Sequence, residues 1–151
     1  MKLSTSAEVI GIGAVVVSLI FVAYELRQNS MITAVDSAQH LAEMGQELSM
    51  LKMQPEFADL ILKATNNFES LSQREHFIFT EIVRSEFNLW EQAYLSHREG
   101  VLLDDVWEIW NASFCEETPT EWFRAFAQFD PGGSFLPEFL ALQKQCSEER
   151  L

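Results

Sequence analysis

The 151-residue sequence predicts an all-α protein, in which an N-terminal transmembrane helix continues into a small aromatic-rich helical bundle. Three observations predict this fold class. An uninterrupted apolar run stands near the N-terminus, apolar residues downstream recur every three or four positions, and no segment alternates apolar and polar residues as a half-buried strand does. We expect two parts: a transmembrane anchor over residues 1–30 and an acidic soluble helical domain over residues 31–151.

The apolar run occupies residues 9–24 and reads VIGIGAVVVSLIFVAY. Counted from Ala7 to Leu26, it gives 20 residues and about 30 Å of helix, which matches the hydrocarbon core of a bilayer. A cleaved signal peptide fits less well, because a cut after Ala23 puts the bulky Phe21 at the third position before the cut. A buried soluble helix also fits less well, because a helix that is apolar on every face needs protein all around it. We therefore interpret the run as a membrane span.

The small residues inside this span follow a helical spacing. They are Ala7, Gly11, Ala14 and Ser18, which share one face of the helix. Small residues at such a spacing let another helix approach closely in lipid. Glycine and alanine are also common in membrane helices for no specific reason, and this alternative stays open. We predict that the face is a helix–helix interface with a second copy or with another membrane subunit.

The apolar pattern continues beyond the span as a second face, which we predict to be a juxtamembrane interface. Its residues are Met31, Ala34, Ala38, Leu41, Gly45 and Leu48. Asn29–Ser30 is the weakest point of this helix and the expected place of a bend. The helix should end near Met53, because Pro55 disfavours the α conformation in the residue before it.

Start and stop signals mark the first two helices downstream. Pro55 suits the first position of a short helix that we expect to end at Ala64. Ser72 followed by Glu75 is a capping-box pattern, and it opens the strongest helix of the chain. That helix should end at about residue 98, with Gly100 as its C-terminal cap.

Three further helices are expected towards the C-terminus. Asp104 is the expected N-cap of the first, and the cap signal in residues 118–121 (TPTE) starts the second. The turn DPGGS follows in residues 130–134, and its Ser134 is expected to cap the last helix.

Large aromatic residues recur through these helices. They include Trp90, Tyr94, Trp107, Trp110, Trp122, Phe123 and Phe126. Their helical spacing favours core packing. The alternative is that the rings line a ligand pocket.

The charge excludes one class of partner. Residues after position 30 include 21 acidic and 8 basic side chains, and the net charge of the chain is −13. Such a surface repels phosphate backbones, and no basic cluster is present, so nucleic acid is not expected as a partner.

No motif for catalysis or cofactor binding is recognised. The chain has no phosphate-binding loop, no dinucleotide-binding glycine pattern and no nucleophile elbow. The Glu-x-x-His pattern of di-iron bundles is absent as well. His40, Glu43 and Glu47 lie on neighbouring turns of one helix and could touch a metal, although a solvated polar face explains them better. We therefore expect no catalytic residue, no metal ligand and no cofactor.

Two cysteines, Cys115 and Cys146, stand 31 positions apart. This number is too small for a disulfide framework, and the spacing suits neither zinc nor redox chemistry. The favoured interpretation is two partly buried free thiols. A single bridge is expected only if the domain faces an oxidising compartment.

Several segments resemble a loose, uncharacterised group of bacterial single-pass membrane proteins. The segments are YELRQN, FNLWEQAYLSHREGVL, DDVWEIW, TEWFRAF and FLPEFLAL, and the similarity covers roughly residues 10–142. Members of the group have one N-terminal span that ends in an Arg-Gln-Asn tract, followed by a small helical domain with spaced tryptophan and phenylalanine. The resemblance implies a fold type and a membrane anchor in a bacterial inner membrane, and it transfers no catalytic residue.

The charges on the two flanks of the span are nearly equal, so they give little information on the side of the membrane that the soluble domain occupies. The N-terminal flank offers the α-amine and Lys2, and the other flank offers Arg27 against Glu25, which slightly favours an external domain. Similar proteins often carry more arginines just after the span, which implies a cytoplasmic domain. We expect a cytoplasmic soluble domain.

These observations lead to one main hypothesis of function. We expect a non-enzymatic membrane protein that contacts lipid and other protein, as a homo-oligomer or as an accessory subunit of a larger membrane complex. The alternative is a membrane-tethered ligand-binding or enzymatic domain with an aromatic-lined pocket.

Overall fold

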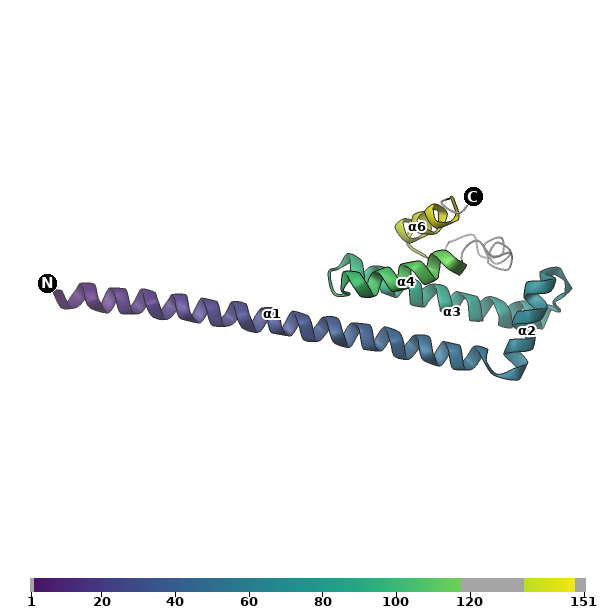
Figure 1. Ribbon diagram of the computed structural model, residues 1–151, viewed down its shortest axis with the longest axis horizontal. Coiled ribbons are helices and arrows are strands. Elements are labelled where there is room, and N and C mark those ends of the chain that lie inside the picture. The colour runs from purple at the N-terminus through teal and green to yellow at the C-terminus, as the bar shows by residue number, and fades with distance from the viewer. Residues whose placement is uncertain (1, 118–134, 149–151) are drawn as a thin grey trace. The chain divides into compact units, whose positions relative to one another are not determined.

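The computed structural model describes residues 2–117 and 135–148. These residues form helices joined by short turns, and no strand occurs among them (Figure 1). The predicted all-α class is therefore confirmed. The elements in chain order are α1 (Lys2–Lys52), α2 (Pro55–Asn66), the short 3₁₀ helix η1 (Phe68–Ser70), α3 (Gln73–Arg98), α4 (Asp104–Glu117) and α6 (Pro137–Glu148).

The chain divides into two compact units, Met1–Asp36 and Ser37–Leu151. The first unit consists of the N-terminal part of α1. The second unit contains the C-terminal part of α1 and all later elements. The boundary therefore falls a few residues after residue 30, the predicted end of the anchor.

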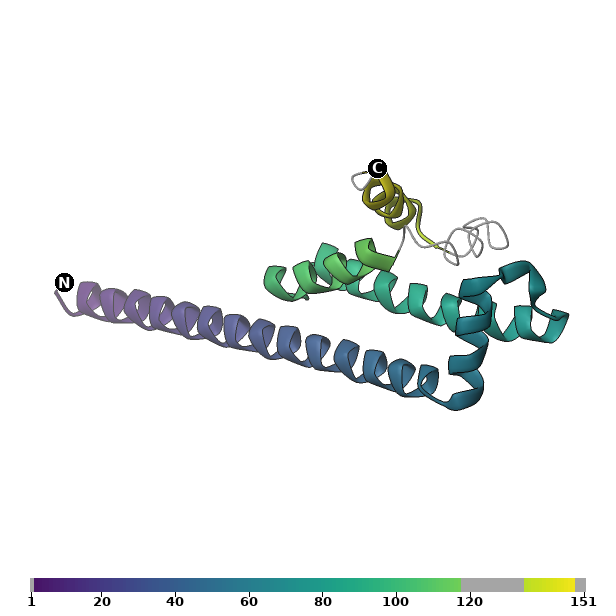
Figure 2. The same cartoon turned by 45° about the vertical axis from the view of Figure 1, so that its right-hand side comes forward.

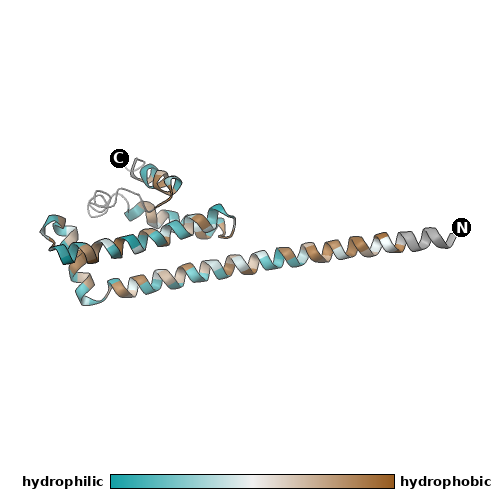
Figure 3. Cartoon of the chain, turned by 180° about the vertical axis from the view of Figure 1, so that it is seen from behind, coloured by the Kyte–Doolittle hydropathy of each residue, from teal (hydrophilic) through white to brown (hydrophobic). Residues whose placement is uncertain are grey.

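The first unit is one apolar helix. Figure 3 shows hydrophobic residues following one another along this part of α1, whereas hydrophobic and hydrophilic residues mix in the later helices. Large apolar side chains from Ile10 to Leu26 are exposed, and the helix is long and apolar enough to cross a membrane. The expected bend at Asn29–Ser30 is absent, because α1 is helical without a break to Lys52. The Ser30 hydroxyl donates to the Leu26 carbonyl at 2.9 Å and so fits into the helix.

The helix starts in the middle of the chain follow the predicted signals. Gln54 is extended, with φ −65° and ψ 137°, and Pro55 is the first residue of α2. At the start of α3, the Glu75 carboxylate accepts from the Ser72 backbone N–H at 2.7 Å. The Glu75 N–H donates to the Ser72 hydroxyl at 3.3 Å, which completes the predicted capping box.

The end of α3 follows its prediction as well. Gly100 has a φ of +69°, the left-handed conformation that glycine adopts without a steric penalty. Its N–H donates to the His97 carbonyl at 2.9 Å, and the Val101 N–H donates to the Ser96 carbonyl at 2.8 Å. These two bonds form a Schellman motif, which satisfies carbonyls that the helix end would otherwise leave open.

Two predicted starts are wrong in position. Asp104 is the first helical residue of α4 and not its N-cap, because the Leu103 carbonyl already accepts from the Trp107 N–H at 2.9 Å. The last helix starts at Pro137 and not directly after Ser134, since proline suits the first helical position. Ser134 itself lies outside the described residues, as do the cap signal of residues 118–121 and the turn of residues 130–134.

Two clusters of buried side chains hold the second unit together. Figures 1 and 2 show α3 and α4 running side by side. The larger cluster contains side chains of α2, α3, α4 and α6. Its fully buried members include Phe79, Phe114 and Phe139. The smaller cluster joins the C-terminal part of α1 to α3 and to the start of α4, and it contains Leu41, Leu89, Ala93 and Leu102.

Candidate functional site

The predicted small-residue face of the apolar helix in the first unit is open in the chain. Gly11, Ala14 and Ser18 are exposed, and a Cβ added to Gly11 would meet no atom within 4 Å. The Ser18 hydroxyl donates to the Ala14 carbonyl of its own helix at 2.9 Å. The hydroxyl therefore needs no outside acceptor to be placed in lipid. Ala7 belongs to the same helix, but its side chain lies outside the described ones.

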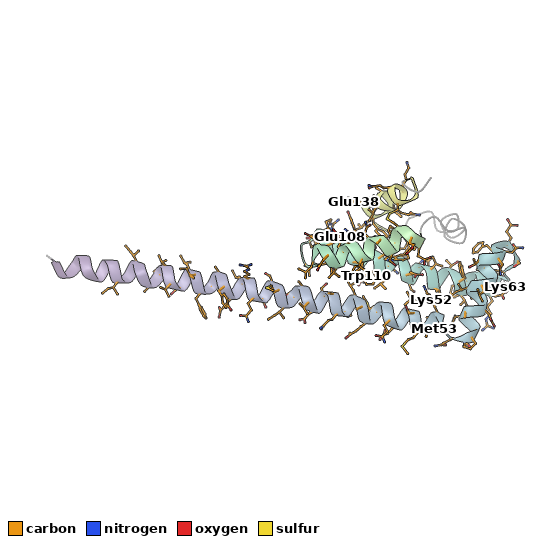
Figure 4. The ribbon with its side chains drawn as sticks, in the orientation of Figure 1. Lys52, Met53, Lys63, Glu108, Trp110 and Glu138 are labelled. Carbon is orange, nitrogen blue, oxygen red and sulfur yellow. A yellow bond between two sulfur atoms is a disulfide. The ribbon has the colours of Figure 1, made fainter. Side chains whose placement is uncertain are left out.

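The predicted juxtamembrane face is largely occupied by the chain itself. Leu41 is buried in the smaller cluster, and Ala38 and Leu48 pack against that cluster. A Cβ at Gly45 would lie 3.4 Å from Cη2 of Trp110, which Figure 4 shows on α4, and 3.6 Å from Cδ2 of Leu89. These four residues of α1 thus contact α3 and α4 of the same chain. The other two predicted residues, Met31 and Ala34, lie earlier on α1 in the first unit.

Several large aromatic residues of the second unit pack on one another. The ring of Phe114 lies 5.1 Å from that of Trp90 and 5.0 Å from that of Phe139, measured between centroids. Tyr94 lies 6.0 Å from both Trp107 and Phe139. Such edge-to-face and stacked pairs are typical of a core. The remaining members of the predicted set, Trp122, Phe123 and Phe126, lie outside the described residues.

A hollow with three charged residues at its edge lies elsewhere in the second unit. Its volume is about 240 Å³, and its apolar lining is formed by Ile61, Phe79, Ile82 and Val83. The charged residues are Lys52 at the end of α1, Glu86 on α3 and Glu117 at the end of α4.

The charges at this hollow influence one another. The Lys52 ammonium donates to Glu86 Oε1 at 2.7 Å. Burial raises the pKa of the Glu117 carboxyl, and the negative charge of Glu86 raises this pKa further, whereas Lys52 acts in the opposite direction. The site therefore combines apolar walls with two carboxyl groups and one ammonium. Sequence reasoning missed it, because its charged residues stand more than 30 positions apart and match no motif.

The three residues considered as possible metal ligands are surface residues of one helix. His40, Glu43 and Glu47 are all exposed on α1. Within residues 2–117 and 135–148, no group of three or more His, Cys, Asp or Glu side chains could hold a metal ion. A different polar pair was not predicted: His97 Nε2 lies 3.1 Å from Asp104 Oδ1, and the His97 ring stacks on Trp107 at 5.0 Å. This pair joins the end of α3 to the start of α4.

The two cysteines form a disulfide, and the favoured interpretation of two free thiols is therefore wrong. Cys115 on α4 and Cys146 on α6 have Cα atoms 4.9 Å apart, within the range that a disulfide requires. The physical reason is that α6 packs on α4 through Phe139 and Phe114, which brings the two sulfurs together. A sequence separation of 31 residues does not reveal this contact.

One part-buried polar contact fixes the residue that precedes α6. The Leu136 backbone N–H donates to Glu91 Oε1 on α3 at 2.6 Å. Leu136 precedes Pro137, so its N–H has no partner within the helix, and the carboxylate supplies one.

Comparison of the chain with protein-family models, with curated proteins and with solved structures finds no match.

Proposed function

We propose that the chain is a non-enzymatic, single-pass protein of a bacterial inner membrane that acts through contacts with other protein. The observation that carries this proposal is the long apolar helix of the first unit, whose large apolar side chains are exposed. Moving each such side chain from water into lipid is favourable by roughly 1.5–3 kcal/mol. A helix of this kind belongs in a bilayer.

The contact surface that we propose within the membrane is the face of Ala7, Gly11, Ala14 and Ser18. Lipid chains are as apolar as leucine, so helices associate in a bilayer through close packing. The open space beside Gly11 and the internally bonded Ser18 hydroxyl allow a second backbone to approach. The partner is a second copy of the chain or a helix of another subunit.

The contacts of the juxtamembrane face narrow this proposal. Ala38, Leu41, Gly45 and Leu48 already pack inside the second unit. A partner that bound to them would have to displace α3 and α4. We therefore assign the partner contact to the span, and we regard the second part of α1 as a support for the helical domain.

The proposal is tested with two matched double variants of the full chain. Gly11→Leu with Ala14→Leu fills the proposed face, and Gly13→Leu with Ala23→Leu makes the same additions on the other side of the helix. Purified in a mild detergent, the first variant should lose its partner and give a smaller particle by light scattering, while the second should match the wild type. Equal sizes for all three proteins would remove the face from the proposal. Recovery of the wild type in the soluble fraction would refute the anchor.

A second candidate function rests on the charged hollow. The hollow has apolar walls, and it carries two carboxyl groups but one ammonium. This lining suits a small apolar molecule that carries a positive charge. Hexylamine is a suitable probe, and hexanoate of the same chain length is the control. Binding of hexylamine that Glu117→Gln weakens, without binding of hexanoate, would support this candidate. Failure of both probes to perturb the resonances of Ile61 and Val83 would count against it.

A further inference from the structure

The disulfide is built into the folded second unit. The side chain of Cys146 is buried in the larger cluster, with an exposed fraction of 3%, and Cys115 is half-buried. Phe114 and Phe139 pack beside the bridge and are fully buried. A bond in this position joins α4 to α6 as part of the core. It is poorly accessible to a soluble reductant, unlike the exposed disulfides that act as switches.

A bridge of this kind constrains the compartment in which the unit folds. Glutathione and thioredoxin keep cytoplasmic cysteines reduced, whereas structural disulfides form and persist in the periplasm and outside the cell. The chain has two cysteines, and both are in the bridge. If the unit folded in the cytoplasm, both sulfurs would instead be buried as thiols.

The charges next to the span do not oppose export of the second unit. Arg27 is the one basic residue between the span and Lys52, and Lys2 stands on the other side. Orientation depends on the excess of lysine and arginine within about 15–20 residues of the ends of a span. With one basic residue on each flank, nothing in this pattern holds the second unit inside.

We propose that the second unit faces the oxidising side of the membrane, with the N-terminus of α1 inside. This inference rests on the proposed single span and reverses the expected cytoplasmic side of the helical domain. It also implies a transient partner, a dithiol–disulfide oxidoreductase of that compartment.

The oxidation is a thiol–disulfide exchange. The thiolate of one cysteine attacks the disulfide of the oxidoreductase and forms a mixed disulfide. The second cysteine then attacks the sulfur of the first, which closes the Cys115–Cys146 bond and releases the oxidoreductase as a dithiol. The two electrons and the two protons of the thiols thus pass to the partner. The exchange takes place before α6 packs, because Cys146 is covered afterwards.

The test measures thiol state and side of the membrane in the same cells. Cells that express the full chain are quenched with acid, and the membranes are treated with a maleimide–polyethylene glycol of 5 kDa, with or without prior reduction. We expect no adduct without reduction and two after it. The Cys115→Ser variant, which has one thiol, should give a single adduct without reduction, and this confirms that the reagent reaches the denatured chain. Alkaline phosphatase fused after Leu151 should be active, because this enzyme folds only after export.

The outcomes distinguish a failure of the assigned side from a failure of the single span. The assigned side would be overturned by two adducts without reduction. It would also be overturned by an inactive phosphatase together with a fluorescent cytoplasmic reporter fused at the same position. A wild-type chain that alkaline carbonate extracts from the membranes would overturn the single span instead. In cells that lack the periplasmic dithiol oxidase, the fraction of chains with free thiols should rise several-fold, and an unchanged fraction would remove the oxidoreductase from the inference.

Discussion

Substitution of Phe139 by alanine should destabilise the second unit strongly. The Phe139 side chain is fully buried, and its ring contacts those of Phe87, Phe114 and Tyr94 at centroid distances of 5.0–6.3 Å. A buried phenylalanine removes at least about 150 Å² from water, which at roughly 25 cal/mol per Å² gives about 4 kcal/mol. Measured losses for Phe→Ala in cores, about 3–5 kcal/mol, agree with this value.

The assay is equilibrium urea unfolding of the full chain in a mild detergent, followed by tryptophan fluorescence. All four tryptophans belong to the second unit, so the signal reports on that unit and not on the first. Phe77→Ala is the matched control, because Phe77 on α3 is 68% exposed and its loss should change the free energy of unfolding by less than about 0.5 kcal/mol. Similar small effects of the two substitutions would refute the packing of α6 on the core.

Three further predictions concern charge and covalent bonding. The hydrogen bond from Lys63 lowers the pKa of the Glu75 carboxyl to about 2. The carboxylate therefore stabilises the fold fully above its ordinary pKa of 4.5, and this stabilisation is lost as the pH falls towards 2. Glu75→Gln should therefore lower the melting temperature at pH 7 but not near pH 2, and an equal loss at both pH values would contradict this account. The pKa of Glu117 is raised, so its ionised form opposes folding at neutral pH and its protonated form does not. Glu117→Gln should raise the melting temperature at pH 7, and the matching gain in the free energy of unfolding should be under ~1 kcal/mol for this half-exposed group. No gain is expected below pH 4.5, and a gain that persists in acid would refute the assigned cause. Replacing Cys115 and Cys146 by serine opens a loop of 31 residues. The free energy of unfolding, measured in urea under oxidising conditions, should fall by about 3–4 kcal/mol. An unchanged free energy would mean that the bridge does not constrain the unfolded chain.

The sequence predicts the helices well where a local signal determines their ends. The capping box of Ser72 and Glu75 and the left-handed Gly100 depend on neighbouring residues alone, and both are present in the structure. The starts of α4 and α6 were predicted at the wrong residues, because the Leu103 carbonyl begins the hydrogen bonding of α4 and Pro137 takes the first position of α6. The Asp104 carboxylate lies beside His97, and the Glu91 carboxylate accepts the N–H of Leu136.

The groups at the candidate sites were less predictable than the helices that carry them. Lys52, Glu86 and Glu117 meet because α1, α3 and α4 pack together, and no spacing in the chain encodes that contact. The same is true of Cys115 and Cys146, whose pairing depends on how α6 lies on α4. Hydrophobic periodicity predicts which face of a helix is covered, but it does not identify what covers that face.

The two glycines of α1 illustrate this last point. Gly11 and Gly45 each stand in a row of small or apolar residues with a spacing of three or four. A Cβ at Gly11 would meet no atom within 4 Å, whereas a Cβ at Gly45 would touch Trp110 and Leu89. The same pattern is thus satisfied within the chain at Gly45 and left open at Gly11. In lipid, helices associate through close packing, and small residues on one face of a helix permit that packing. The proposed partner helix would fill this open face, and the paired leucine variants at Gly11 and Ala14 test that contact.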